Sequence, residues 1–333
     1  NSDLFGFSLS WELDGPILLK LLKENRIPIW SNLRSEYDPI IFGGGQVLTA
    51  NPEPFAPFLD VVLLGDGENL LPEFISSVKE IEGMTRNNKL RILSKIPGIY
   101  VPSLYEPKYG SNGELIETRP KYDDVPQKIS KQTWQQNTLS QSSVITPESA
   151  WPNIHMIEVV RSCPELCRFC LASYLNLPFR NSSLKEGLIP AVEKGFNFTN
   201  RIGLLGASIT QHPEFDELLN WLKDDRFDGM RLSLSSVRAS TVNSKMTNLL
   251  YRRNSKSITI AVESGSEKLR KVVNKKLTEE EIFTAARYAK EGGLSGLKLY
   301  SMVGLPTENN DDIQATANLL LTIKRKNPGL RLK

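Results

Sequence analysis

Residues that carry metal or nucleophilic chemistry are scarce in this chain of 333 residues, which has three cysteines and two histidines, His155 and His212. The odd number of cysteines and their tight spacing exclude a disulfide framework. No apolar run is long enough to cross a bilayer, and the first residues do not form a signal-peptide pattern, so we expect a cytoplasmic protein without a membrane partner. The net charge of +3 is too small to indicate a class of partner.

The composition is that of an ordinary globular protein, with 40% hydrophobic and 24% charged residues. The length is sufficient for two domains. The sequence begins with what reads as a buried strand at 3–8 and ends with what reads as the start of another strand at 330–333. We therefore expect the chain to be a fragment of a longer protein.

All three cysteines lie in one short segment, Cys163-Pro-Glu-Leu-Cys167-Arg-Phe-Cys170. Thiolates at this density are typical metal ligands. An iron–sulfur cubane normally takes four cysteine ligands, so three would leave one iron open to a group that is not protein. A zinc site of three cysteines and one histidine is a second interpretation, because structural zinc accepts this spacing, although neither histidine is near the segment in the sequence. A chance cluster is the third.

The pattern CxxxCxxC, with Phe169 directly before the last cysteine, resembles the signature of the radical S-adenosylmethionine (SAM) superfamily. The resemblance implies that Cys163, Cys167 and Cys170 hold a 4Fe-4S cluster whose fourth iron chelates the amino and carboxylate groups of SAM. It also implies an electron donor such as flavodoxin or ferredoxin. Cleavage of SAM to methionine and a 5′-deoxyadenosyl radical would then allow hydrogen abstraction from a substrate that the sequence does not identify.

From residue 155 onward, short apolar strands alternate with amphipathic helices, which is the pattern of a parallel α/β sheet. Each predicted strand is followed by a predicted helix, and a sixth strand begins at 330. The strands are 155–161, 201–206, 230–235, 257–263 and 296–303, and the helices are 182–195, 214–224, 241–253, 279–291 and 311–326. This is similar to the partial (β/α)6 barrel of radical SAM cores over residues 151–333, truncated before closure. Chemistry in such barrels lies at the carboxyl ends of the strands, where the cysteine segment leaves the first strand.

Residues at the other strand ends stand where the family contacts SAM. Ser208 follows the second strand, where many members have a Gly-Gly-Glu motif, so the carboxylate of that motif is missing here. Ser235 and Arg238 follow the third, and the Arg238 guanidinium would pair with the SAM carboxylate. The resemblance implies that Glu263 contacts the ribose and that the backbone at Gly304 faces the adenine. Each position alone also fits a helix cap or a turn.

Residues 1–93 read as part of a doubly wound α/β domain with ligand loops at the strand ends. Glycine-rich turns at 43–45 and 65–67 follow two of its strands, but their spacing matches neither a dinucleotide motif nor a P-loop. Together with Ser8 they resemble the cobalamin-binding domain of cobalamin-dependent radical SAM proteins, as found in uncharacterised members with a divergent domain. The resemblance implies that Ser8, Gly43 and Gly44 flank the nucleotide tail of cobalamin. Residues 1–93 contain no histidine, so a domain that keeps the fold without the ligand is the alternative.

Two further segments bear on the organisation of the chain. Residues 94–150 are predicted to be a surface linker, because few apolar residues follow Tyr105. Residues 245–276 carry nine lysines and arginines. Such a run is usually a solvated helical face and less often a polyanion site.

We therefore predict a radical SAM enzyme, with methyl transfer favoured if cobalamin binds. The alternative is a methylthiotransferase-like enzyme that modifies RNA or a ribosomal protein, because residues 263–278 resemble the same stretch of those enzymes. Against that alternative, the extra cysteines of a second, sulfur-donating cluster are absent from these residues. A non-catalytic iron–sulfur or zinc scaffold is the third interpretation. The sequence does not identify a catalytic side chain.

Overall fold

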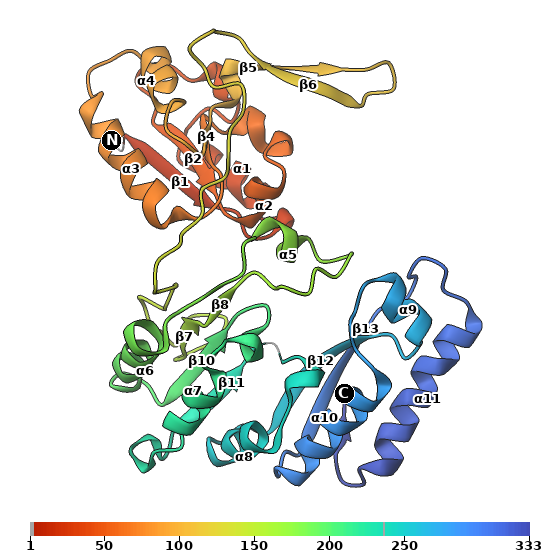
Figure 1. The fold of residues 1–333 in the computed structure, drawn as a ribbon. Coiled ribbons are helices and arrows are strands. Elements are labelled where there is room, and N and C mark those ends of the chain that lie inside the picture. The colour runs from red at the N-terminus through yellow and green to blue at the C-terminus, as the bar shows by residue number, and fades with distance from the viewer. Residues whose placement is uncertain (1–2, 236) are drawn as a thin grey trace. The chain divides into compact units, whose positions relative to one another are not determined.

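The computed structural model describes residues 3–235 and 237–333 and divides the chain into two compact units, residues 1–135 and 136–333 (Figure 1). We call them unit 1 and unit 2 and describe each by itself. In the part of the chain that is described, no helix is both long and apolar enough to span a membrane.

Unit 1 is a four-stranded α/β sheet in the order β1-β2-β3-β4. The first three strands are parallel and the fourth is antiparallel to β3. Helices α1 and α2 lie on one face and α3 and α4 on the other (Figure 1). The elements are β1 (Leu4–Ser8), α1 (Gly15–Glu24), β2 (Ile40–Gly44), α2 (Gln46–Ala50), β3 (Val61–Leu63), α3 (Gly67–Glu80), α4 (Arg86–Leu93) and β4 (Ile99–Tyr100). The β3 strand is wholly buried and apolar, as expected for a parallel strand covered on both faces.

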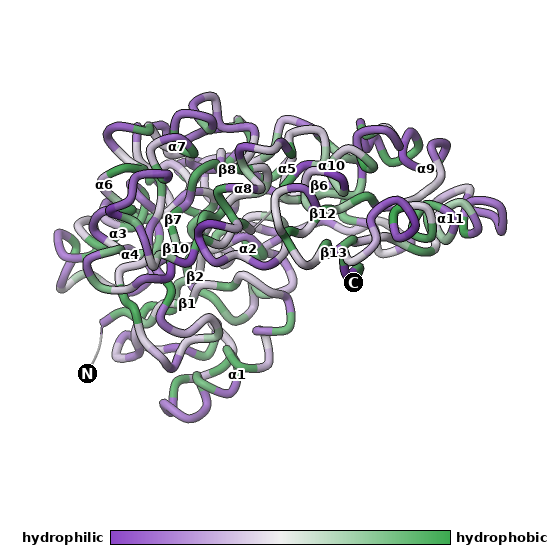
Figure 2. Tube along the Cα trace, turned by 90° about the horizontal axis from the view of Figure 1, so that it is seen from below, coloured by the Kyte–Doolittle hydropathy of each residue, from purple (hydrophilic) through white to green (hydrophobic). Residues whose placement is uncertain are grey.

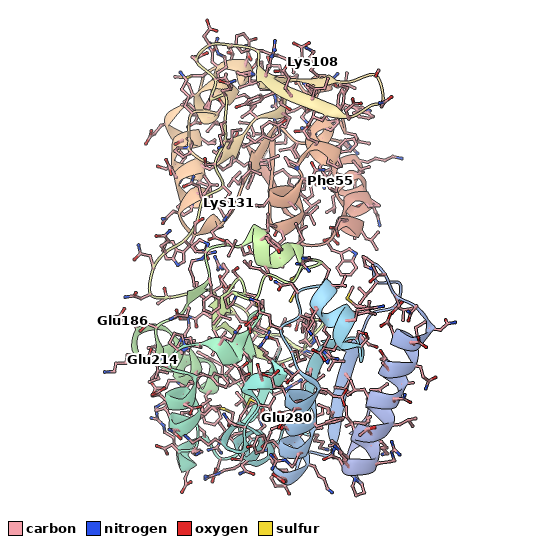
Figure 3. The ribbon with its side chains drawn as sticks, turned by 45° about the vertical axis from the view of Figure 1, so that its right-hand side comes forward. Phe55, Lys108, Lys131, Glu186, Glu214 and Glu280 are labelled. Atoms are coloured by element: carbon pink, nitrogen blue, oxygen red, sulfur yellow. The ribbon has the colours of Figure 1, made fainter. Side chains whose placement is uncertain are left out.

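Unit 1 extends through most of the segment that the sequence analysis treats as a linker. Tyr105 is buried, and its hydroxyl donates to the backbone carbonyl of Pro126 at 2.6 Å. An antiparallel hairpin of β5 (Tyr105–Tyr109) and β6 (Leu115–Pro120) follows, with an exposed ion pair of 3.6 Å between Lys108 and Glu117 (Lys108 is labelled in Figure 3). A few buried anchors and paired backbone groups therefore suffice to order a polar segment.

Unit 2 contains six parallel strands in two sheets, β7-β10-β11 and β12-β13-β14. A parallel bridge between Val237 and Ile260 joins the two sheets, so the strands follow one another in chain order. The strands are β7 (His155–Glu158), β10 (Arg201–Leu205), β11 (Arg231–Leu234), β12 (Ser257–Glu263), β13 (Gly296–Ser301) and β14 (Arg331–Leu332). The helices are α5 (Leu171–Leu175), α6 (Ile189–Phe196), α7 (Phe215–Trp221), α8 (Ser244–Arg252), α9 (Glu267–Val272), α10 (Glu279–Glu291) and α11 (Asn310–Lys326). The predicted partial six-stranded barrel is confirmed, and its sheets remain open.

One apolar core lies between the strands and the helices of unit 2. Leu204, Leu232 and Ile260, on three strands, are at most 1% exposed. Figure 2 shows hydrophilic and hydrophobic residues alternating along α11, whose buried side includes Leu319 and Ile323. This alternation buries one stripe of each helix against the sheet. Truncating one such leucine to alanine would cost about 2–5 kcal/mol.

Helix starts in unit 2 are fixed by side chains. A capping box begins α10, in which Thr278 accepts from the Glu281 backbone N–H and the Glu281 carboxylate accepts from that of Thr278. Before α6, Ser183 Oγ accepts from the Glu186 backbone N–H at 3.2 Å (Glu186 is labelled in Figure 3). Such contacts satisfy polar groups that the first helical turn leaves unpaired.

Candidate functional site

The cysteine loop, residues 162–170, leaves the short strand β8 (Val160–Arg161) beyond the carboxyl end of β7. Its three thiols are free; Cys167 is buried, and Cys163 and Cys170 are half-buried. Cys163 and Cys167 line an open cavity of about 140 Å³ within unit 2. Cys170 precedes α5, and its Sγ accepts a hydrogen bond from Ser173 Oγ at 3.3 Å. Burial raises the pKa of the Cys167 thiol, Lys275 opposes that shift, and the two neighbouring thiols add to it.

The loop is held in place by the segment that follows α9. The Asn274 side-chain amide donates to the carbonyls of Glu165 and Leu166, at 3.2 and 2.9 Å. The Arg168 guanidinium donates to the carbonyls of Lys271 and Val272 at the end of α9. Carbonyls at a helix C-terminus lack partners within the helix and carry partial negative charge, so an arginine is well suited to them. The chain thus ties the cysteine loop to a segment about 100 residues away in the sequence.

The arrangement of the thiols gives no support to a site for a single metal ion. Among the described residues, no group of three histidine, cysteine or acidic side chains gathers closely enough to hold one metal ion. The His212 ring is occupied, since Nε2 lies 2.7 Å from the Ser182 carbonyl and Nδ1 accepts from the Glu214 backbone. The zinc interpretation therefore gains no support from His212. A cubane spreads its ligands over separate irons, so three thiols of one loop can bind it without converging on one point.

Three of the residues that the sequence analysis places at the strand ends line the same cavity as the cysteines. They are Ser208, Ser235 and Arg238. The Ser208 hydroxyl donates to the Gln211 side-chain carbonyl at 2.6 Å. The Ser235 hydroxyl donates to the Gly206 carbonyl at 3.1 Å, which ties the ends of β10 and β11 together.

Glu263 and Gly304 are not among the residues that line this cavity. The Glu263 carboxylate is buried and is held by Lys275, whose Nζ lies 3.0 Å from Oε1. Lys275 itself lines the cavity, so Glu263 contacts a residue of the cavity wall without lining the cavity. Gly304 lies in the loop after β13, where its backbone N–H donates to the Glu308 carboxylate.

Four polar residues that line the cavity were not predicted from the sequence: Glu165, Thr259, Lys275 and Tyr300. Glu165 lies inside the cysteine motif, so its proximity to the cysteines was available from the sequence. Thr259 and Tyr300 are on β12 and β13, and their positions on the inner face follow from the alternation of each strand. Lys275 is in a loop, and only the fold places it there.

Left-handed backbone conformations occur at non-glycine residues in the cysteine loop, at the end of β12 and in the loops that follow α9 and β13, as well as elsewhere in the described chain. Non-glycine residues with positive φ include Ser162 (70°), Leu166 (52°), Glu263 (64°), Asn274 (55°) and Thr307 (69°). Each such conformation costs about 1–3 kcal/mol and persists only where surrounding contacts impose it. Strain of this kind is typical of functional sites.

The basic run 245–276 is largely consumed by internal contacts. Six of its lysines and arginines lie within 4.0 Å of a carboxylate that is not part of the cysteine loop. Arg270 instead donates to the carbonyls of Ser264 and Leu277. The six pairs are Lys245–Asp216, Arg252–Asp225, Arg253–Asp228, Lys268–Asp312, Lys271–Glu267 and Lys275–Glu263. A further lysine, Lys276, lies 3.8 Å from Glu165. The fold therefore accounts for the buried or largely buried members of the run, Arg253, Arg270 and Lys275, while the other paired lysines and arginines stay exposed to solvent.

In unit 1, Ser8 and Gly44 are paired in register at the carboxyl ends of β1 and β2. A β-carbon at Gly43 would lie 2.6 Å from Leu48 Cδ1, so internal packing is sufficient reason for that glycine. A β-carbon at Gly44 would meet ordinary contacts of 3.5 Å or more. The protein's own packing does not require a glycine there, whereas a ligand that approached the backbone would require one.

An open parallel sheet with three free thiols at its carboxyl edge, preceded by an α/β unit, defines the radical SAM class of α/β proteins. Two family comparisons agree with this assignment. Residues 157–320 match the family described as "Radical SAM superfamily", and residues 1–102 match "Radical SAM proteins, N-terminal". The chain belongs to the radical SAM superfamily.

Individual relatives extend the similarity to nearly the whole chain. An uncharacterised protein of Methanocaldococcus jannaschii, MJ0966, is 29% identical over 330 residues, which is 98% of this chain and 64% of that protein. A tRNA-2-methylthio-N(6)-dimethylallyladenosine synthase of Alkaliphilus oremlandii is 23% identical over 175 residues, covering 49% of this chain and 37% of the synthase.

Solved structures show the same two-unit fold. The radical SAM methyltransferase TsrM from Kitasatospora setae matches with a TM-score of 0.65 at 15% identity, covering 97% of this chain and 61% of that one. The cobalamin-dependent radical SAM enzyme OxsB, solved with aqua-cobalamin and SAM, matches with a TM-score of 0.62 at 16% identity, covering 96% and 43%. The chain spans less than two thirds of the length of each of these relatives.

Proposed function

We propose that this chain forms the core of a radical SAM enzyme, with Cys163, Cys167 and Cys170 as the ligands of a 4Fe-4S cluster. The observation that carries the proposal is the position of three free thiols on one loop at the carboxyl edge of the sheet. Two of them share a cavity with Arg238, a cation suited to a ligand carboxylate. When bound, the cluster supplies the electron that cleaves SAM and so generates a 5′-deoxyadenosyl radical.

The residues of this chain would bind and orient SAM. Arg238 would pair with the methionine carboxylate, while Ser208 and Ser235 would offer hydroxyls along the cavity wall. Glu263 and Gly304 stay in the proposal as contacts for the ribose and the adenine. Glu263 would take part together with Lys275, which holds its carboxylate. The burial of Cys167 would limit the access of water to the cluster.

The surroundings of this core are also proposals. An electron donor such as flavodoxin or ferredoxin would reduce the cluster, and a cytoplasmic, reducing compartment would protect it. The substrate stays open. Hydrogen abstraction followed by methyl transfer is the reaction that we favour, because the two-unit fold is shared with a radical SAM methyltransferase.

The test is anaerobic reconstitution with iron and sulfide, followed by addition of dithionite and SAM. We expect about four irons per chain, thiolate-to-iron absorption in the visible region and release of 5′-deoxyadenosine. Cys167→Ala should abolish the release while the thermal unfolding temperature of the rest of the fold stays close to that of the wild type. Bound zinc, or an intact cluster that never cleaves SAM, would contradict the proposal.

A methylthiotransferase-like enzyme acting on RNA or a ribosomal protein is the alternative, because relatives of that kind match about half of the chain. It would need ligands for a second cluster, and the cysteines of these 333 residues are all in one loop. The pairing of much of the basic run with carboxylates of the same chain also weakens the feature that pointed to RNA. We therefore rank it below methyl transfer.

Cobalamin binding by unit 1 is a separate hypothesis, supported by the fold shared with OxsB and by the glycine at position 44. Ser8, Gly43 and Gly44 would flank the nucleotide tail. The chain should be purified after expression with the vitamin and examined for a corrin spectrum. A bound corrin that is lost in Gly44→Val would support the hypothesis, and the absence of a corrin spectrum from the purified chain under every condition would end it.

A further inference from the structure

Glu165 stands at the centre of a charged network between the cysteine loop and the strand ends. Arg238 Nη1 lies 3.3 Å from Glu165 Oε2, and Lys276 Nζ lies 3.8 Å from the same oxygen. Gln211 Nε2 donates to Glu165 Oε1 at 2.6 Å. The Arg238 and Glu165 side chains are only 12% and 14% exposed, so water screens this pair weakly.

Every nitrogen of the Arg238 guanidinium has an acceptor within the protein. Nε donates to Ser240 Oγ at 2.9 Å, Nη2 donates to the Lys276 carbonyl, and Nη1 faces Glu165. A guanidinium binds a carboxylate most strongly through two parallel N–H donors. The five N–H donors of the guanidinium are not exhausted by these three acceptors, but a second carboxylate that used Nη1 as one of a parallel pair would approach the nitrogen that now faces Glu165.

Glu165 and Arg238 both line the cavity that holds Cys163 and Cys167. Any carboxylate that entered this cavity would therefore meet the Glu165 carboxylate as well as the Arg238 guanidinium. The two carboxylates would repel each other, and this repulsion is largest where the groups are shielded from water.

We propose that Glu165 is an internal competitor for Arg238: its carboxylate and the carboxylate of SAM bind the same guanidinium in turn. This inference rests on the proposed function, because it takes the cavity to be the SAM site. On SAM binding, the Arg238–Glu165 ion pair is exchanged for an Arg238–ligand pair. Glu165 then keeps Lys276 and Gln211, which already contact it. Because Glu165 is part of the cysteine loop, the exchange would also link ligand binding to the position of that loop.

The competitor role and a purely structural role predict opposite effects. If Glu165 competes, removing its charge frees Arg238 and SAM binds more tightly. If Glu165 only holds the loop and orients Arg238, its loss disorders the site and SAM binds more weakly.

The experiment is a double-mutant cycle with the reconstituted chain. Kd for SAM is measured by anaerobic equilibrium dialysis for the wild type, Glu165→Gln, Arg238→Met and the double variant. We expect Glu165→Gln to lower Kd about tenfold when Arg238 is present, and to lower Kd by clearly less in the Arg238→Met background, where only the direct repulsion between the two carboxylates is relieved. Glu165→Asp, whose shorter side chain withdraws the charge from Arg238, should fall between wild type and Glu165→Gln.

Iron content and thermal unfolding temperature establish that each variant is folded and carries the cluster. Glu267→Gln is the matched control, because Glu267 is an exposed carboxylate paired with Lys271 at 2.6 Å and should leave Kd unchanged. An unchanged or higher Kd for Glu165→Gln, or equal tightening in both backgrounds, would overturn the inference while leaving the proposed function intact. A wild-type protein that holds its cluster but does not bind SAM would overturn both.

Discussion

At the scale of single residues, the pair of Glu263 and Lys275 links the site to the stability of unit 2. Both side chains are largely buried, at 9% and 14% exposed, and their charged atoms are 3.0 Å apart. Lys275→Met would leave a buried carboxylate without its partner, which costs about 3–5 kcal/mol. Urea unfolding should show this loss, and Lys275→Met combined with Glu263→Gln should recover much of it. Equal stability of wild type and Lys275→Met would show that the pair contributes nothing.

The free energy of unfolding should depend on pH through the carboxyl group of Asp312. Hydrogen bonds from Lys268 and Ser266 lower the pKa of the Asp312 carboxyl below its usual range. The folded state therefore favours the charged form of Asp312. The stability that this carboxylate contributes is fully present above the pKa of the unfolded state, and it is lost as the pH falls through the lower pKa of the folded state. The difference in unfolding free energy between wild type and Asp312→Asn should be constant near neutral pH and shrink in acid. A difference that grew on acidification would have the wrong sign.

At the scale of elements, the loop between β12 and α9 depends on close contact with α11. A β-carbon at Gly265 would lie 2.4 Å from Thr316 Cα and 2.5 Å from the Ala315 carbonyl, both backbone atoms of α11. Gly265→Ala must therefore displace the helix, and overpacking of this kind costs about 1–3 kcal/mol. Gly67→Ala is the matched control, because a β-carbon there meets no atom within 4 Å at the start of α3. Thermal unfolding compares the two, and a neutral Gly265→Ala would contradict the close packing.

The helix predicted over 182–195 has a different hydrogen-bond pattern in its first part. The sequence predicts one helix over 182–195, but the structure has a π-helical turn at 184–188 that leads into α6. The Leu188 N–H donates to the Ser183 carbonyl five residues earlier. Pro190, at the start of α6, has no N–H to donate. The apolar period identifies a helix, but it does not distinguish the two hydrogen-bond patterns.

At the scale of the whole molecule, the order of the six parallel strands could be predicted because each βα repeat adds a strand beside the last. The strand ends also placed Ser208, Ser235 and Arg238 beside the cysteines. The pairing of Glu165 with Arg238 could not be predicted, since the two are 73 positions apart and no local pattern relates them. For the same reason, residues 94–135 were predicted to be a linker. Tyr105 anchors this segment through a hydrogen bond to the Pro126 carbonyl, and no local pattern relates these two residues.

In the enzyme that we propose, three thiolates hold a cluster and leave one iron for SAM. The most direct measurement is electron–nuclear double resonance on the reduced, reconstituted chain with SAM labelled with 17O in its carboxylate and 15N in its amino group. We expect hyperfine coupling from both labels to the cluster, and we expect Cys167→Ala to lose it. Coupling to neither label, with a fourth protein side chain on that iron, would contradict it.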